Sequence, residues 1–430
     1  MKPSKYNYIV EYGDRVIFFN GITEQLFDIP INNRSSYETI ISSPDLYSDD
    51  FGSFLMKLKG CGFIIDDDAD EMDLIEHKFH SLRYESDYHV MILPTYQCNL
   101  RCWYCVQDHQ DLNMSEETKD NIRILFEKIV LNPEIKRLRL SWFGGEPLLG
   151  YKTVLSLTSH AKELSNKYGK EFFCDITTNG TLLNRERIKS LREAGVSHYQ
   201  ITIDGTKEMH DKIKVLGNHS SFEKSMENIN IIAETTSCTL RFNYTNENLN
   251  PQGIMEDIRR RIKESNRANM SFLIYKVWQE DWNKIGFSDV EKLASLSAEE
   301  GIRSKLPTTN LCYADAKNFI CIFPNGLIEK CDNESPLAAR GHLSDGEILW
   351  EEGTEAHIPA FRNKQFPCYK CRYIPLCWGP CVAKRDKMLR ENGKGLCQYE
   401  DMDVEMERNI VNMYINTLNN RRLSEINKVK

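Results

Sequence analysis

Apolar residues in this chain fall into short strand-like stretches separated by longer stretches with a helical period. Between positions 89 and 277 the strand-like stretches predict strands. These strands are residues 89–94, 137–143, 171–177, 198–203, 238–244 and 271–277. The stretches between them predict helices near residues 115–131, 152–167, 184–194, 221–234 and 251–264. Because parallel strands are usually joined through a helix, this alternation predicts βα units around a parallel sheet.

The first 88 residues follow a different pattern. A hairpin is predicted, with a Gly-Asp turn at 13–14, and a third short strand near 25–27. Helices follow, one of them starting with a serine cap at Ser35, and then a further strand. The hairpin strands are 8–12 and 15–19, the helices 35–41 and 51–58, and the last strand 61–65. We interpret the acidic run 66–71 as a solvated linker and expect a C-terminal amphipathic helix from 400 to about 420.

Composition narrows the class of protein. The net charge of -8 gives no basic surface for nucleic acid. No apolar run approaches the ~18 residues of a membrane span, and the first residues lack the apolar core of a signal peptide. Fourteen cysteines in a chain that is not exported favour metal ligands over disulfides. We therefore expect a cytoplasmic metalloprotein with no nucleic-acid or membrane partner.

Three of the cysteines lie directly after the first predicted barrel strand. Cys98, Cys102 and Cys105 have the spacing C-x3-C-x2-C. An iron–sulfur cube takes one thiolate per iron, so three thiolates leave one iron open. A zinc knuckle lacking one ligand is the alternative, but structural zinc sites are closed. The motif strongly resembles the radical S-adenosylmethionine superfamily. That resemblance implies a 4Fe–4S cluster on these cysteines, S-adenosylmethionine on the open iron, and cleavage that yields a 5′-deoxyadenosyl radical.

Further elements of the superfamily pattern stand where predicted strands end. Trp142-Phe143-Gly144-Gly145-Glu146-Pro147 contains the Gly-Gly-Glu-Pro element, which in the family holds the methionyl ammonium, with Glu146 as an acceptor. The resemblance also implies cofactor contacts from strand-end residues and from the residue that closes a His-Asp motif at 210–214. These candidates are Asn179, Thr202, Asn243 and Lys214. For Asn179 and Thr202 ordinary turn chemistry is an equal alternative, and Asn243 could instead cap its loop. Lys214 stands where the family usually has arginine and lacks the bidentate fork for a carboxylate.

A second cysteine block follows the predicted barrel. Cys312 precedes Gly326-x4-Cys331, and later come C-x2-C-x5-C-x3-C and a final cysteine. This pattern resembles the SPASM domain, which carries two auxiliary 4Fe–4S clusters. The resemblance assigns Cys312, Cys331 and Cys381 to the nearer cluster, and Cys368, Cys371, Cys377 and Cys397 to the distal one. Cys321 completes the near cluster or is a core thiol, and an unfilled fourth iron of that cluster could instead bind substrate. Zinc is the alternative metal for this block. Cys61, Cys174 and Cys238 are expected to be inert buried thiols.

Asp332 follows Cys331 directly, where relatives have an aspartate proposed as a proton acceptor. Beside a cluster in a dry cavity its carboxylate could act as a catalytic base. A surface aspartate on a loop is the alternative.

The sequence as a whole predicts an α/β protein with three domains. Residues 1–88 resemble a winged-helix-like leader-peptide recognition domain, which would bind peptide by strand addition. Residues 89–305 would form a partial (β/α)6 TIM-like barrel, and residues 306–430 an iron–sulfur SPASM domain with a C-terminal helix. The implied activity is an oxidoreductase with three 4Fe–4S clusters and S-adenosylmethionine. It would abstract hydrogen from a ribosomal precursor peptide to install a thioether or carbon–carbon crosslink. Flavodoxin or ferredoxin would serve as the reductant of the enzyme. An anaerobic sulfatase-maturing enzyme forming formylglycine is the alternative, and a peptide-binding pseudoenzyme is a third possibility.

Overall fold

The computed structural model describes residues 1–83, 86–107, 109–277, 279, 287–332, 339–351 and 359–429. The chain divides into two compact units. Residues 1–84, 308–317 and 357–415 form what we call the terminal unit, and residues 85–307, 318–356 and 416–430 form the barrel unit. The division into domains at 1–88, 89–305 and 306–430 stays a prediction.

The barrel unit is built on one sheet of 11 strands in its described residues, in the order β12-β11-β10-β9-β8-β7-β6-β13-β14-β15-β16. Neighbours from β6 to β12 are parallel. They are β6 (Asp87–Ile92), β7 (Arg137–Trp142), β8 (Glu171–Thr178), β9 (His198–Ile203), β10 (Ser237–Tyr244), β11 (Met270–Lys276) and β12 (Arg303–Lys305). Every predicted barrel strand is confirmed within two residues at each end. The parallel α/β core of a partial barrel is therefore confirmed.

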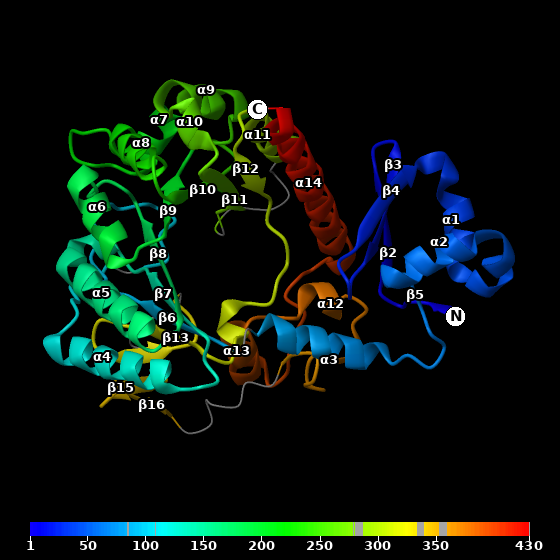
Figure 1. The fold of residues 1–430 in the computed structure, drawn as a ribbon, viewed down its shortest axis with the longest axis horizontal. Coiled ribbons are helices and arrows are strands. Elements are labelled where there is room, and N and C mark those ends of the chain that lie inside the picture. The colour runs from blue at the N-terminus through cyan, green and yellow to red at the C-terminus, as the bar shows by residue number, and fades with distance from the viewer. Residues whose placement is uncertain are drawn as a thin grey trace. The chain divides into compact units, whose positions relative to one another are not determined.

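Helices connect these strands as predicted. They are α4 (Glu116–Leu131), α5 (Tyr151–Lys167), α6 (Arg185–Ala194), α8 (Ser221–Ile232) and α9 (Pro251–Arg261). Figure 1 shows α4, α5 and α6 along the outer side of the sheet. Ser115, Asn184 and Ser220 fix helix starts because their side chains accept a backbone N–H of the first turn. The prediction missed α7 (Lys207–Ile213), α10 (Glu264–Arg267) and α11 (Phe287–Glu299).

Residues after position 318 extend the barrel sheet. β13 (Phe319–Ile322) lies parallel to β6, with Cys321 opposite Met91. The antiparallel strands β14 (Leu327–Glu329), β15 (Gly341–Ser344) and β16 (Glu347–Trp350) continue from it. The strand that precedes the first cysteine motif therefore lies between β7 and a strand from the second cysteine block.

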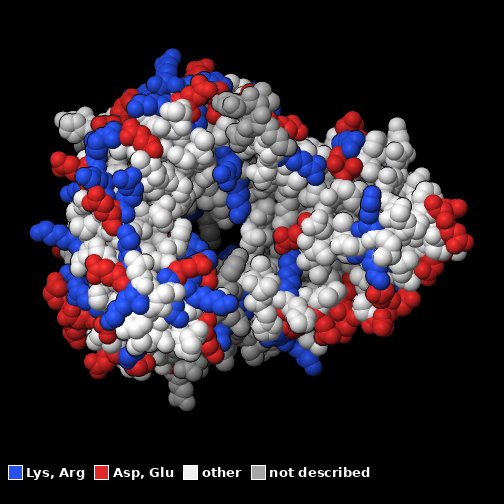
Figure 2. Space-filling model, in the orientation of Figure 1, with Lys and Arg blue, Asp and Glu red and all other residues white. Residues whose placement is uncertain are grey.

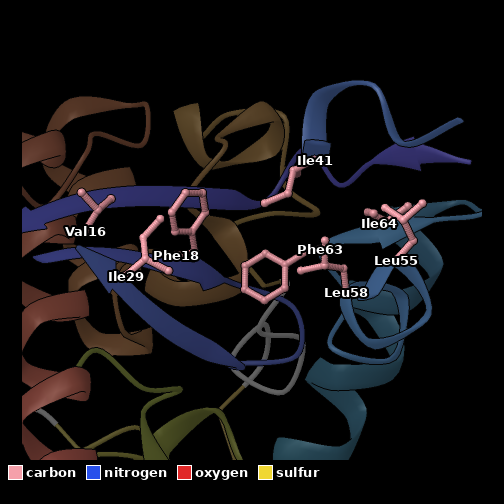
Figure 3. Close-up of a cluster of buried hydrophobic side chains, with 8 residues drawn as sticks. All are labelled: Val16, Phe18, Ile29, Ile41, Leu55, Leu58, Phe63 and Ile64. Atoms are coloured by element: carbon pink, nitrogen blue, oxygen red, sulfur yellow. The ribbon is translucent and has the colours of Figure 1, made fainter. Parts of the chain in front are cut away.

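The terminal unit begins with the predicted hairpin. β2 (Asn7–Tyr12), β3 (Arg15–Asn20) and β4 (Leu26–Pro30) form a three-stranded antiparallel sheet with β3 in the centre. Then come α1 (Arg34–Ser42), α2 (Ser48–Gly60) and β5 (Ile64–Ile65), which pairs with β1 (Lys2–Pro3). Two short 3-10 turns lie at Ile31–Asn33 and Pro44–Tyr47. Figure 3 shows the buried side chains that hold sheet and helices together, Phe18 and Phe63 among them.

One prediction for this region is wrong, and another fails at its last residue. α1 starts at Arg34 after Asn33, so Ser35 lies inside the helix, and Asn33 makes no side-chain capping bond. Residues 66–70 form the expected, largely exposed linker, but Glu71 begins α3 (Glu71–Leu82) and is only 7% exposed. Its carboxylate accepts the hydroxyl of Ser4 and so ties the helix to the N-terminal segment.

The terminal unit also draws a core from distant parts of the chain. Ile75 and Phe79 of α3 pack in one buried cluster with Cys368, Ile374 and Trp378. The later part comprises turns and short helices at Tyr313–Asp315, Pro367–Lys370, α12 (Ile374–Cys377) and α13 (Val382–Asn392). The last helix, α14 (Met402–Val429), is longer than predicted.

The surface carries charges of both signs. Figure 2 shows Lys and Arg side chains among Asp and Glu over the helices of the barrel unit, where Arg261 pairs with Glu223 and Asp257. In the described part of the chain no helix has the length and apolar character needed to cross a membrane.

Candidate active site

The three cysteines of the first motif lie on one loop after β6. Cys98, Cys102 and Cys105 are each partly exposed and form no disulfide. The amide of Leu100 donates to the Cys98 sulfur at 3.4 Å, and burial raises the pKa of the Cys98 thiol to about 11. Among the described residues no three His, Cys, Asp or Glu side chains converge on a single-ion site. A cube that takes one thiolate per iron does not require such convergence.

The Gly-Gly-Glu element is fitted tightly against this loop. The amide of Gly145 donates to the Thr95 carbonyl at 3.2 Å, and that of Glu146 to the Gln97 carbonyl at 2.7 Å. A Cβ at position 145 would lie 2.1 Å from the Gln97 oxygen, so only glycine allows this approach. Gly144 has φ +116°, which favours glycine, and a Cβ there would lie 2.6 Å from the Thr95 oxygen. These glycines position the cysteine loop on the end of β7.

The carboxylate of Glu146 joins the ends of β7 and β8. It is fully buried and accepts the Thr178 hydroxyl at 2.7 Å and the amides of Asn179 at 2.8 Å and Leu148 at 3.0 Å. Burial raises its pKa, against the opposing effect of these donors. Three protein donors give Glu146 a structural task, and its contact with a methionyl ammonium stays a prediction.

Asn179 connects β8 to the cysteine loop. Its side-chain amide donates to Asn99 at 2.9 Å, and its side-chain oxygen accepts the amide of Thr181 at 2.9 Å. The Asn179 nitrogen also lies 4.0 Å from the Cys98 sulfur. The turn chemistry expected as an alternative is thus present. The contact of Asn179 with the cofactor stays a prediction.

The other two strand-end candidates lie on β9 and β10. Thr202 is partly exposed and stands opposite Arg241 in the β9–β10 register. Asn243 accepts the Arg241 guanidinium at 3.0 Å. Their contacts with a cofactor stay predictions.

A buried charge network connects the cysteine loop to β9 and α7. The Tyr104 hydroxyl donates to the Asp204 carboxylate at 2.6 Å. The Lys214 ammonium lies 3.4 Å from the same Asp204 oxygen and 3.4 Å from the Cys102 sulfur. Burial alone would lower the pKa of Lys214, but Asp204 and its neighbours hold it well above its usual value. Sequence reasoning missed Tyr104, although an aromatic residue between two of the motif cysteines was a usable signal.

The second cysteine block comes close to the first motif within the barrel unit. The side chain of Gln107, two residues past Cys105, donates to the Asp332 carbonyl at 3.0 Å. Asp332 is 7% exposed, so the alternative of a surface aspartate is wrong, while its role as a base stays a prediction. Cys321 is fully buried, and neighbouring Asp332 and Cys331 add to the effect of burial in raising its thiol pKa. Its role as a fourth iron ligand stays a prediction.

Four predicted ligands are gathered in the terminal unit. Burial, and then the charges of Cys377, Cys371 and Cys397, raise the pKa of Cys368 to about 12. The four cysteines assigned to the distal cluster thus lie in one unit, and their assignment stays a prediction. Of the predicted near set, Cys312 and Cys381 belong to this unit and Cys331 to the barrel unit, and its assignment stays a prediction.

The thiols expected to be inert differ among themselves. Cys174 and Cys238 are buried in β8 and β10 as expected, and burial raises both thiol pKa values. Cys61 is partly exposed and follows α2 instead of lying in a strand.

Comparison with known sequences identifies the barrel. Residues 92–263 match the family described as the Radical SAM superfamily. They form a radical SAM domain. The Fe-coproporphyrin III synthase of Methanosarcina barkeri is 27% identical over 175 residues, 40% of this chain and 41% of that protein. The cysteine-type anaerobic sulfatase-maturating enzyme of Clostridium novyi is 31% identical over 31% of this chain and 37% of its own length. The PqqA peptide cyclase of Bradyrhizobium diazoefficiens is 29% identical over 32% of this chain and 34% of its own length.

The chain therefore spans about two fifths or less of these relatives. Solved structures match more of it. Native anSMEcpe with bound AdoMet and Kp18Cys peptide has a TM-score of 0.57 at 17% identity, covering 78% of this chain and 99% of that one. Streptococcus suis SuiB bound to precursor peptide SuiA has a TM-score of 0.52 at 14% identity, covering 93% and 100%. At these identities the likeness concerns the fold.

A radical SAM domain implies one 4Fe–4S cluster and S-adenosylmethionine. The residues present fit such a cluster, because three free thiols stand on one loop and glycine backbone holds that loop in place. One oxygen of the buried Asp204 carboxylate also lacks a hydrogen-bond partner within the described structure. The donor set of the site suits iron–sulfur ligation with an open iron.

Proposed function

We propose that the protein is a radical S-adenosylmethionine oxidoreductase that modifies a ribosomally made precursor peptide by closing a thioether or carbon–carbon crosslink. The observation that carries this proposal is the three-thiol loop at the carboxyl end of β6, held by Gly145 and Glu146. Support for a peptide substrate comes from the fold, which resembles anSMEcpe with bound Kp18Cys peptide and SuiB with bound precursor peptide SuiA.

Cys98, Cys102 and Cys105 would hold the first cluster, and residues at the ends of β7 to β10 would contact S-adenosylmethionine. When bound, this pair supplies a radical that removes hydrogen from substrate. The chain's own residues prepare the site. Glu146 fixes the ends of β7 and β8, and Asn179 fixes the cysteine loop through Asn99. The Asp332 carboxylate, buried beside Gln107, would accept a proton that the substrate releases.

The second cysteine block would hold two auxiliary clusters, and these would accept the substrate electron or bind substrate. The gathering of Cys368, Cys371, Cys377 and Cys397 in one unit supports the distal cluster. A one-electron donor such as flavodoxin or ferredoxin would reduce the first cluster, and we expect the reaction in the cytoplasm.

We further propose that residues 1–88 recognise a leader peptide. In the described residues β2 and β4 each pair only with β3, so each leaves one backbone edge for an added strand. The same segment exposes large apolar side chains that the core does not use. Leu46 is 80% exposed, Met56 64% and Phe51 44%. An extended peptide would gain affinity from backbone pairing and selectivity from apolar contacts.

Sulfatase maturation is the second candidate, favoured by the 31% identity to the Clostridium novyi enzyme. The two candidates differ in product. A crosslink leaves a peptide that resists fragmentation within the closed ring, whereas formylglycine carries an aldehyde that reacts with a hydrazide.

The test is anaerobic reconstitution followed by mass spectrometry of the precursor peptide. We expect about twelve iron per chain, one cube of four for each cluster. Replacing Cys98, Cys102 and Cys105 with alanine should remove about four of these and abolish cleavage of S-adenosylmethionine. Cleavage that persists in the triple variant would refute the first cluster. A hydrazide-reactive product without a crosslink would replace the proposed activity with the second candidate.

A further inference from the structure

Lys214 occupies a position that a cofactor ligand alone does not explain. It is 5% exposed, and its ammonium faces the Cys102 sulfur and the fully buried Asp204 carboxylate, each at 3.4 Å. A lysine nitrogen has three donors on one atom, so it can serve a sulfur and a carboxylate together. The planar fork of the arginine that is usual here would instead favour two oxygens of one group.

The surroundings keep this charge in place. Asp204 lies at the end of β9 and is itself held by the Tyr104 hydroxyl. The Tyr104 ring lies 5.7 Å from the Lys214 nitrogen and covers it as a cation–π partner. Since both charged groups are buried, salt screens their interaction with the cysteine loop only weakly. The network therefore delivers a fixed positive charge to one ligand sulfur.

We propose that Lys214 raises the reduction potential of the cluster ligated by Cys102, and that an oxygen at position 204 and the Tyr104 ring position its ammonium. Reduction adds one negative charge to a cluster, and a nearby cation or an N–H···S bond stabilises that added charge. Asp204 opposes the effect in part, because its negative charge lies beside the same site. The inference rests on the cluster assignment of the proposed function, and it does not depend on the peptide substrate.

Removing the charge of Lys214 and removing the charge of Asp204 should shift the reduction potential of the cluster in opposite directions. Lys214→Met removes the cation at nearly constant volume, so the ratio of reduced to oxidised cluster at a fixed potential should fall at least tenfold. For a one-electron couple that ratio corresponds to a midpoint about 59 mV more negative. Asp204→Asn removes the negative charge but keeps a side-chain oxygen that can accept from the Lys214 ammonium, so the ratio should shift the other way. Lys214→Arg keeps the charge and should stay within about threefold of the unaltered protein.

The measurement is a redox titration of the full reconstituted chain followed by electron paramagnetic resonance. The relevant signal is the one that changes when S-adenosylmethionine is added, because only a cluster with an open iron responds. Opposite shifts for Lys214→Met and Asp204→Asn support the proposal. Shifts of the midpoint in the same direction, or changes of the ratio within threefold in both variants, overturn the proposal. Loss of packing alone would shift the midpoint of both variants in the same direction.

If Lys214→Met fails to retain its cluster, the midpoint potential of Asp204→Asn is compared with that of Lys214→Arg, which serves as the reference. An unchanged midpoint in Asp204→Asn then overturns the proposal. Absence of any signal responsive to S-adenosylmethionine in the unaltered protein would instead refute the cluster assignment, so the two failures are distinguishable.

Discussion

Gly145→Ala should dislodge the cysteine loop without touching a cysteine. The added methyl group would lie 2.1 Å from the Gln97 oxygen and 2.5 Å from the Tyr96 oxygen, where ordinary contacts begin at 3.4 Å. Both neighbours are backbone, so a side-chain rotation cannot relieve the overlap. The loop or the β7 turn must move by about 1.3 Å to restore the ordinary separation.

The cost can be worked from the contacts. Such a movement strains or breaks the hydrogen bonds from Gly145 to Thr95 and from Glu146 to Gln97, each contributing about 1 kcal/mol. Overpacking adds about 1–3 kcal/mol. We therefore expect a loss of about 3–5 kcal/mol for the barrel unit, which corresponds to a melting temperature lower by about 6–20 °C. Because the Gln97 carbonyl precedes Cys98 directly, about four iron should also be lost after reconstitution.

Circular dichroism during thermal unfolding measures the loss in melting temperature, and iron analysis measures the loss of iron. Gly52→Ala is the matched control, since a Cβ there meets nothing within 4 Å and the residue lies in α2. That variant should be neutral or slightly stabilising. Gly145→Ala with unchanged melting temperature and unchanged iron would refute the idea that close backbone approach holds the loop.

Two further variants test other parts of the molecule. Leu46→Glu combined with Met56→Glu should weaken binding of a labelled leader peptide at least tenfold in fluorescence anisotropy. The control is Leu131→Glu, at a 60% exposed apolar position on α4, which should leave the affinity unchanged. Equal affinities for the two variants would refute recognition through Leu46 and Met56. His210 is fully buried, and burial and the charge of Lys214 lower its pKa to about 3. The folded protein therefore keeps it neutral, and the free energy of unfolding falls as the pH drops below about 6.5, where the unfolded chain gains a proton. This one group should cost about 2 kcal/mol between pH 7 and pH 5, and His210→Asn should remove that part of the acid loss in urea titrations.

The barrel core was predictable because its signals are local. The strands from β6 to β11 are short stretches in which buried apolar residues recur, in β9 and β10 at every second position. Ser115 or Ser220 marks a helix start within one residue. α3 was missed although its signals were present. Asp70 caps the helix, and Ile75 and Phe79 recur at a spacing of four, but the acidic run before them suggested a linker.

The site was only partly predictable because its contacts are long-range. The three thiols and the Gly-Gly-Glu element are visible as motifs. Pairing of β13 with β6 joins segments more than 200 residues apart, and no local pattern announces it. The same holds for the contact of Asp204 with Tyr104, which depends on two loops meeting at one end of the sheet.

The shared core of α3 and the Cys368 region also affects synthesis of the protein. Phe79 leaves the ribosome roughly 290 residues before its partner Cys368, a delay of roughly 15–60 s at ordinary elongation rates. During that interval the apolar face of α3 has no partner from the later segment and is a natural target for chaperones. Residues 1–84 therefore cannot be transplanted between enzymes as a cassette. A chimera would need to carry the Cys368–Trp378 segment with them, because the two segments complete one fold.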